Sequence, residues 1–292
     1  MFLLDIPPFS PNLIQDVRDM LSFDFMRYAF LAGTPLAIVS GLVGYFVVLR
    51  NLVFATDTLA HVTFTGALFA VVVGSNPMLG LFGVTMLVAL LLGVVGTRAQ
   101  SKDVEVGTVL AWVLGLGALL LSIYTSQSSG ANSTIGVNYL FGSILGLQLE
   151  QAQLVAVVGV VVIVGLLLIA RPLLFASLDS EVAAARGIPV RTISVIFLLL
   201  VALSIAEAVP AVGALLNSAL LVTPAAIAHR LATRPFVALF LSAGLSLAFV
   251  WVGLTISFYA SYPVSFLIST LAFLTYVTVV IWQRVCATNF SE

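Results

Sequence analysis

The chain has 292 residues, of which 61% are hydrophobic and only 8% are charged, and its formal net charge is -1. Soluble domains carry roughly a quarter charged residues, so this composition excludes a soluble enzyme and a disordered chain. The chain has no excess of basic residues that would attract the phosphates of a nucleic acid, and we expect no nucleic-acid partner. The mean hydropathy of +1.21 and the long uncharged stretches are typical of a polytopic membrane protein.

Residues 1–27 precede the first long apolar stretch. The apolar residues between Leu13 and Leu21 fall on one helical face, with charged residues opposite. We expect an amphipathic helix on the outer membrane surface, with a disordered tail as the alternative. The charged residues in this segment argue against a cleavable signal peptide.

Nine stretches are apolar and long enough for a membrane-spanning helix, which needs about 20 residues. They cover residues 28–49, 52–73, 78–97, 104–124, 151–170, 192–209, 212–229, 235–257 and 263–283. Their apolar runs are continuous rather than alternating, which favours an all-α protein over a barrel. The sequence therefore predicts one transmembrane domain over 28–284 and a short tail over 285–292.

The basic residues predict the orientation. With strict alternation of nine spans, one side receives nine of the eleven Lys and Arg residues. These are Arg50, Arg98, Lys102, Arg171, Arg186, Arg191, Arg230, Arg234 and Arg284. Because cytoplasmic loops are enriched in Lys and Arg, we expect the N-terminus outside and the C-terminus inside.

Two loops are distinctive. The stretch 137–147 on the outer side is too short to span, and we expect an external or re-entrant helix whose Gly142 and Gly146 allow close packing. The inner segment 171–191 predicts a surface helix of about two to three turns, because Asp179 is a good N-cap and Gly187 suits the C-terminal stop. Such a helix serves either as a docking surface for another protein or as a plain connection.

The chain has no G-x-x-x-x-G-K-[ST] sequence, because its only lysine, Lys102, follows Ser101. Without that loop it cannot cradle the phosphates of ATP. We therefore expect no ATPase activity from this chain alone, so that active transport would use an ion gradient or a separate ATPase subunit.

Asp57 and His61 lie four residues apart in the second span and share a helical face. An acid inside a span costs a few kcal/mol unless it meets water, a cation or a partner. Carboxylate oxygen and imidazole nitrogen suit zinc, manganese or ferrous iron. A structural Asp–His hydrogen bond and a salt bridge from Asp57 to Arg50 are the alternatives.

Three further acids are candidates for an ion pathway. Asp103 and Glu105 begin the fourth span, where they either favour a helix N-terminus or form an exit site for an ion. Glu207 lies near the outer end of the sixth span, and we interpret it as an interfacial residue or as a residue at the entrance. His229, at the inner end of the seventh span, is interpreted as an interfacial residue rather than a ligand.

Several short motifs follow one another along the chain. They are Gly44–Arg50 (GYFVVLR), Asp57–His61 (DTLAH) with Gly66, Phe141–Leu145 (FGSIL), Asp179 with Ala183 and Gly187, Val212–Leu216 (VGALL), Ala219–Leu221 (ALL) and Pro224–Ala228 (PAAIA). Their order resembles that in the permeases of zinc, manganese and iron ABC importers. Each motif is weak alone, but their ordered combination covers about residues 28–284.

The resemblance implies an all-α permease of about eight or nine transmembrane helices, similar to vitamin B12-type importers and located in the bacterial inner membrane. It implies a homodimer, two cytoplasmic ABC ATPase subunits, and an extracytoplasmic solute-binding protein that delivers the ion. The cargo would be zinc or manganese, possibly iron, with no permanently bound cofactor. By the same resemblance, Asp179, Ala183, Ala184 and Gly187 match the helix that couples to the ATPase. A permease for a metal chelate or small organic cofactor, and an ion-gradient-driven transporter, are the alternatives.

Overall fold

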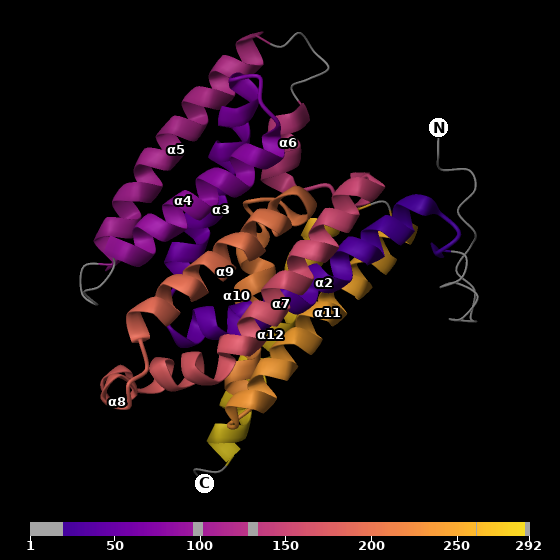
Figure 1. Cartoon of the computed structure of the whole chain (residues 1–292). Coiled ribbons are helices and arrows are strands. Elements are labelled where there is room, and N and C mark those ends of the chain that lie inside the picture. Colours follow the sequence, from indigo (N-terminus) through magenta and orange to yellow (C-terminus); the bar gives the residue numbers. More distant parts are fainter. Residues whose placement is uncertain (1–19, 96–101, 128–133, 261, 290–292) are drawn as a thin grey trace.

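The computed structural model describes residues 20–95, 102–127, 134–260 and 262–289, and its regular elements in these ranges are all helices (Figure 1). They are α2 (Asp24–Leu49), α3 (Val53–Val72), α4 (Pro77–Val95), α5 (Lys102–Gln127), α6 (Thr134–Phe141), the 3-10 turn η1 (Ile144–Gly146), α7 (Leu149–Leu178), α8 (Ser180–Ala185), α9 (Val190–Val212), α10 (Asn217–Leu231), α11 (Pro235–Ala260) and α12 (Val264–Asn289). The predicted amphipathic helix falls mostly on residues 1–19, which lie outside these ranges.

Within the described part of the chain, eight helices are long and apolar enough to cross a membrane: α2, α3, α4, α5, α7, α9, α11 and α12. This confirms the predicted all-α polytopic fold. The predicted full span over 212–229 is wrong, because its place is taken by α10, which has only 15 residues. At 1.5 Å per residue α10 is about 22 Å long, shorter than the hydrocarbon core of about 30 Å.

The junction between α9 and α10 explains the shorter helix. Gly213 has a φ of 93°, which ends α9, and the turn that follows uses residues that the apolar pattern assigns to a helix. The chain nevertheless reverses here: α9 begins beside Arg50, through Ser194, whereas α10 ends with His229 stacked on Tyr45, near the same end of α2. The alternation on which the predicted orientation rests is therefore retained.

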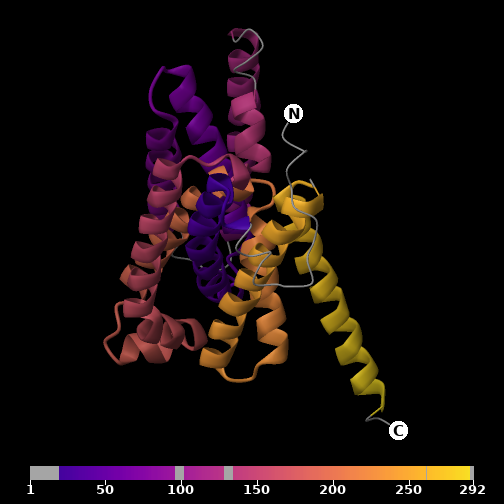
Figure 2. The same ribbon diagram turned by 90° about the vertical axis from the view of Figure 1, so that its right-hand side faces the viewer.

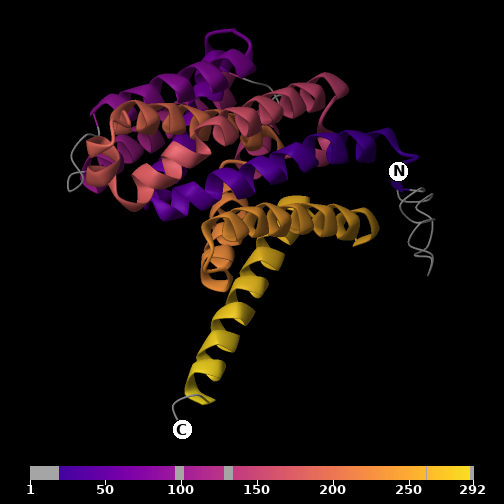
Figure 3. The same cartoon turned by 60° about the horizontal axis from the view of Figure 1, so that its bottom comes forward.

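The helices divide into a buried inner group and an outer group. In their apolar windows, 72% of α2, 72% of α3 and 67% of α9 are buried, against 22% of α4, α5 and α12. Phe46 of α2 and Phe197 of α9 meet at the centre with their ring centroids 6.0 Å apart. The C-terminal half of α12 leans away from the remaining helices (Figures 2 and 3).

Close helix packing in the inner group depends on glycine. A Cβ atom at Gly44 of α2 would collide with the Leu221 carbonyl of α10, and one at Gly41 would lie 2.5 Å from the Cα of Ala243 in α11. In a membrane, where lipid is as apolar as leucine, such close backbone approach supplies much of the association energy. These glycines thus fix α10 and α11 against α2.

The segment 137–147 is short, as predicted, and enters the bundle. The Ser143 amide donates to the Pro210 carbonyl at 3.2 Å, and the Ala214 amide donates to the Tyr139 carbonyl at 3.0 Å. Gly142, at φ 75°, lies directly against the backbone of Val212 and Gly213, which confirms the close packing expected at Gly142. A Cβ at Gly146 would meet only Ser143 of the same segment, so the expectation is wrong for Gly146.

Candidate functional site

Asp57 and His61 are neighbours on one face of α3, one turn apart. The Asp57 Oδ2 and the His61 Nε2 are separated by 4.0 Å, and the side chains are 39% and 14% exposed respectively. The other carboxylate oxygen, Oδ1, accepts a 2.9 Å hydrogen bond from the Ser218 hydroxyl in the first turn of α10. The pair therefore has a third polar neighbour that comes from 161 residues further along the chain.

Arg50 does not pair with Asp57, so the salt-bridge alternative is wrong. Its Nη2 donates to the Ser194 hydroxyl at 2.6 Å, and its guanidinium lies 5.7 Å from the centroid of the Phe197 ring. Both partners are in α9, because the end of α2 crosses the start of α9 there. Burial lowers the pKa of Arg50 below its ordinary value, although a guanidinium stays charged in proteins.

The face of α3 that carries Asp57 opens outward from this chain, since Val53 and Phe54 beside it are also exposed. A carboxylate, an imidazole and a hydroxyl provide three donors. No group of three or more His, Cys, Asp or Glu side chains gathers anywhere in the described ranges. Because a complete transition-metal shell usually has four or more ligands, these three groups could fill at most part of such a shell.

Glu207 is not interfacial, so that interpretation is wrong. Its side chain is only 1% exposed, and a Cβ placed on Gly159 of α7 would lie 3.6 Å from each of its carboxylate oxygens. Pro210 resembles a helix end in the sequence, but α9 continues through it to Val212. Glu207 is therefore followed by five more helical residues, and α7 covers its side chain.

The structure says less about the other candidate residues, Asp103, Glu105 and His229. Asp103 and Glu105 stand in the first turn of α5, and their side chains fall outside the described residues. His229 stacks on the Tyr45 ring at 4.5 Å and 8°, with its Nε2 3.1 Å from the Tyr45 carbonyl oxygen. The imidazole of His229 thus holds α10 against α2, in keeping with its interpretation as a non-ligand.

The segment after α7 forms the predicted surface helix, although α8 has only six residues. Asp179 caps it, because its Oδ1 accepts hydrogen bonds from the amides of Glu181 at 3.1 Å and Val182 at 3.0 Å. Gly187, at φ 80°, ends it. Ala183 is fully buried against the bundle, whereas Ala184 is exposed.

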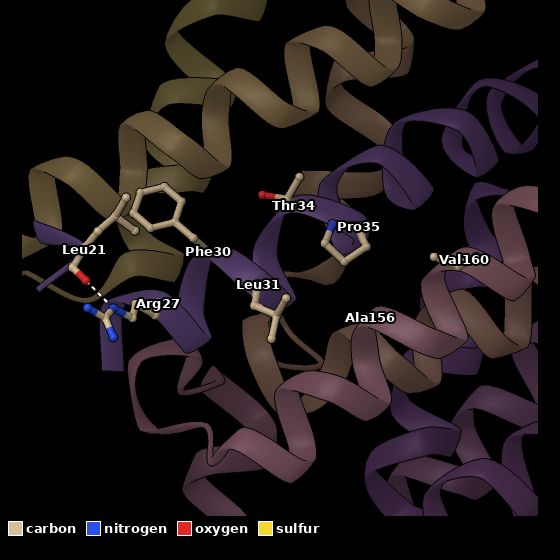
Figure 4. A pocket seen from close by; sticks show the side chains of 8 residues that line it. All are labelled: Leu21, Arg27, Phe30, Leu31, Thr34, Pro35, Ala156 and Val160. Atoms are coloured by element: carbon tan, nitrogen blue, oxygen red, sulfur yellow. Dashed lines mark hydrogen bonds between the residues drawn. The ribbon is translucent and has the colours of Figure 1, made fainter. Parts of the chain in front are cut away.

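Two hollows lie on the surface. One of about 390 Å³ adjoins α8 and is lined by Arg171, Leu174, Phe175, Leu178 and Phe236. Another of about 470 Å³ lies between α2 and α7, with Arg27, Leu31, Pro35 and Val160 among its lining (Figure 4). The lining of the second hollow is mostly apolar, with Arg27 and Thr34 as its polar side chains.

Comparison with known proteins decides the family. The model of the ABC 3 transport family matches residues 22–283. The chain belongs to the ABC 3 transport family. It is 30% identical to the manganese transport system membrane protein MntC of Halalkalibacterium halodurans over 80% of this chain and 78% of that protein. It is 28% identical to the manganese import system permease protein ScaB of Streptococcus parasanguinis over 83% of this chain and 85% of that protein.

Solved structures confirm the fold. PsaBC from Streptococcus pneumoniae, in complex with a Fab, superposes with a TM-score of 0.79 at 24% identity, covering 91% of this chain and 94% of that chain. An inward-facing metal-chelate type ABC transporter superposes with a TM-score of 0.69 at 18% identity, covering 95% and 91%. The predicted resemblance and the multi-pass inner-membrane location are confirmed.

Sequence reasoning missed Ser218 and Ser194. Each is a serine in a largely apolar helix, and neither stands in a motif with the residue that it contacts. Only the packing of α10 on α3 and of α9 on the end of α2 brings them to Asp57 and Arg50.

Proposed function

We propose that this chain is the membrane-spanning permease subunit of an ATP-driven importer for a divalent transition metal ion, with manganese as the first candidate. The observation that carries the proposal is the Asp57–His61 pair, held by Ser218 on an open face of a helix that has no other titratable residue. Similarity to permeases named for manganese import supports the choice of metal. Zinc and iron would be accepted by the same donor types.

The geometry suits a transient ion. The Oδ2 of Asp57 and the Nε2 of His61 are 4.0 Å apart, close to twice a metal–ligand bond of about 2.1 Å, so one ion between them would touch both. Ser218 satisfies Oδ1 and leaves Oδ2 free toward that position. An incomplete shell from one chain binds weakly, which is what an ion in transit requires.

A second copy of this chain would complete the site. In a homodimer whose two α3 helices face each other, two carboxylates and two imidazoles would surround the ion. The exposure of Val53, Phe54 and Asp57 on one face of α3 supports this arrangement. An extracytoplasmic solute-binding protein would deliver the ion to that face from the outer side.

ATP hydrolysis would reside in two separate cytoplasmic ATPase subunits that dock at α8. The exposed Ala184 beside the capped start of the helix provides a small-residue surface, and the adjoining hollow around Phe175 and Phe236 is open to an apolar side chain of a partner. We assign residues 28–284 to the permease domain, with the coupling segment at 171–191, and residues 285–292 to a tail. Asp103 and Glu105 would lie on the inner side of the ion path.

Uptake of radioactive manganese by proteoliposomes that contain the purified complex tests the proposal. Asp57→Asn keeps the size of the side chain and its contact with Ser218 but removes the charge, and His61→Ala removes the imidazole. We expect each to lower uptake by roughly tenfold or more, with unchanged assembly and basal ATPase activity. The control is Glu150→Gln, which removes an exposed carboxylate at the start of α7.

The competing outcomes are distinct. Normal uptake by assembled Asp57→Asn complexes would remove Asp57 from the ion path. Uptake of zinc but not manganese by the wild-type complex would change the metal and keep the site. Uptake without ATP, driven by an imposed ion gradient, would favour a secondary transporter.

A further inference from the structure

Glu207 is the only Asp or Glu side chain within the described residues that is fully buried. Neither of its carboxylate oxygens has a hydrogen-bond partner. Because Gly159 of α7 carries no side chain, the carboxyl group fits against that helix, and Pro35 of α2 lies beside it. The contact of α2, α7 and α9 is therefore built around a carboxyl group.

No cation in the described part of the chain pairs with this acid. The titratable and charged groups described on α9, on the elements packed against it and at their ends are Asp24, Arg27, Tyr28, Tyr45 and Arg50 of α2, Asp57 and His61 of α3, Tyr139 of α6, Glu150 and Arg171 of α7, Glu181 and Arg186 of α8, Arg191 of α9, and His229 and Arg230 of α10. None of them hydrogen-bonds to Glu207. Arg27 is paired with Asp24, and Arg50 donates to Ser194 at the far end of α9. A buried, unpaired carboxylate costs several kcal/mol, so the carboxyl group is stable there only with a proton.

Three more buried side chains near the same helices have polar atoms without a partner. They are the hydroxyls of Ser204 in α9 and Ser40 in α2, and both the amide nitrogen and the amide oxygen of Asn217 in α10. Buried polar groups in folded proteins are almost always hydrogen-bonded, and internal water commonly provides the missing partner. Each of these groups therefore needs a partner that the protein itself does not provide.

The register of α2 and α9 aligns two of these groups. The helices are antiparallel, because Arg50 contacts Ser194 at one end and Pro35 lies beside Glu207 toward the other. Ser40 and Ser204 stand between these two contacts, at the same level along the bundle. Ser204 is also three residues before Glu207, which places both on neighbouring sides of α9.

The register of α2 and α10 places Asn217 level with Ser40. These helices run in the same direction, because Gly44 meets Leu221 and Tyr45 stacks on His229. One turn earlier on the two helices stand Ser40 and Asn217. The next residue, Ser218, donates to Asp57, so the series of polar groups ends at the candidate metal site.

We propose that Glu207, Ser204, Ser40 and Asn217 form a polar seam that binds internal water and one proton in the core of the bundle. The proton resides on the Glu207 carboxyl group and keeps the α2–α7–α9 contact neutral. Water molecules join that carboxyl group to the two serine hydroxyls and to the Asn217 amide. The seam is a binding site in its own right and does not depend on which ion, if any, the chain transports.

Infrared spectroscopy of the purified wild-type chain in lipid, with and without ¹³C-labelled glutamate, tests for the proton. We expect at neutral pH the carbonyl stretching band of a protonated carboxyl group, and we expect the label to shift that band. Glu207→Gln should abolish the band. Glu207→Asp, which keeps an acid but not the labelled residue, should leave a band that the label no longer shifts, while Glu150→Gln should leave the spectrum unchanged.

Transfer to D₂O tests for the water. The band should shift to lower frequency as the proton exchanges through the seam, and the exchange should be slower in Ser40→Ala and Asn217→Leu, which remove the partners of the water. Absence of a protonated-glutamate band at neutral pH would overturn the proposal. A band that persists unshifted in D₂O would overturn it as well, because the carboxyl group would then be dry.

Discussion

The Ser218 side chain connects the candidate metal site to α10. Its hydroxyl donates to Asp57 Oδ1 at 2.9 Å, and hydrogen bonds of this kind orient a metal-ligating carboxylate and are worth 10–100-fold or so in metal affinity, in rough terms. Because Ser218 is not itself charged, its loss should leave the fold and the charge of the site unchanged.

Ser218→Ala should therefore weaken manganese binding roughly tenfold without removing it, because the carboxylate keeps its charge and loses only its orientation. Equilibrium dialysis with the metal alone measures the effect. Ser218→Thr, which retains the hydroxyl, should bind as the wild type does. Equal affinity of the two variants would mean that the hydrogen bond contributes nothing to the site.

Gly44 is a second position where one atom decides the packing. An added Cβ would meet the Leu221 carbonyl, which belongs to a helix backbone and cannot rotate away. Overpacking of this kind costs typically about 1–3 kcal/mol, so Gly44→Ala should lower the thermal stability of the detergent-solubilised chain. Gly83→Ala in α4, where an added Cβ meets nothing within 4 Å, should leave the melting temperature unchanged or raise it. A similar loss in both variants would contradict the close α2–α10 packing.

At the scale of single elements, α8 was the easiest to predict. Its two ends are marked by local chemistry, the Asp179 cap and the left-handed Gly187, and neither needs a distant partner. In the Asp57–His61 pair, four-residue spacing alone fixes the common face. By contrast, α9 ends where Gly213 takes a positive φ against the backbone of Gly142, so that α10 begins only at Asn217. An apolar run contains no sign of that contact.

The burial of Glu207 could not be predicted for a related reason. A proline three residues beyond an acid resembles the end of a helix, but Pro210 stands in the last turn of α9 and its carbonyl accepts the Ser143 amide. Glu207 is buried by the packing of Gly159 in α7 and Pro35 in α2 against it, which joins residues far apart in the chain. Burial of this kind depends on tertiary packing and could not be predicted from a single apolar stretch.

The proposed docking of ATPase subunits at α8 leads to a prediction for that helix. Ala184→Arg would place a long cation on an exposed surface without changing the cap at Asp179 or the buried Ala183. We expect loss of ATPase association, measured by co-purification, with normal insertion into the membrane. Ala184→Ser is the control of similar size and should assemble normally. Full assembly and wild-type transport by Ala184→Arg would move the coupling surface elsewhere.

For the whole molecule, the predicted orientation can be tested with a natural reporter, because Cys286 is the only cysteine in the chain and its side chain is exposed near the end of α12. A membrane-impermeant maleimide should label Cys286 only after the cells are opened. In a Cys286→Ser background, Ser75→Cys in the exposed turn between α3 and α4 should be labelled in intact cells. The reverse pattern would invert the topology.

The contact between Gly142 and Gly213 has a consequence for biosynthesis. The two glycines are about seventy residues apart, and three further helices must be made after α6 before Gly213 leaves the ribosome. Closing so long a loop is entropically unfavourable until its contacts form. The contacts between α6 and the turn that follows α9 therefore form late in biosynthesis. They form only after α7, α8 and α9 have been inserted and the turn into α10 has been made.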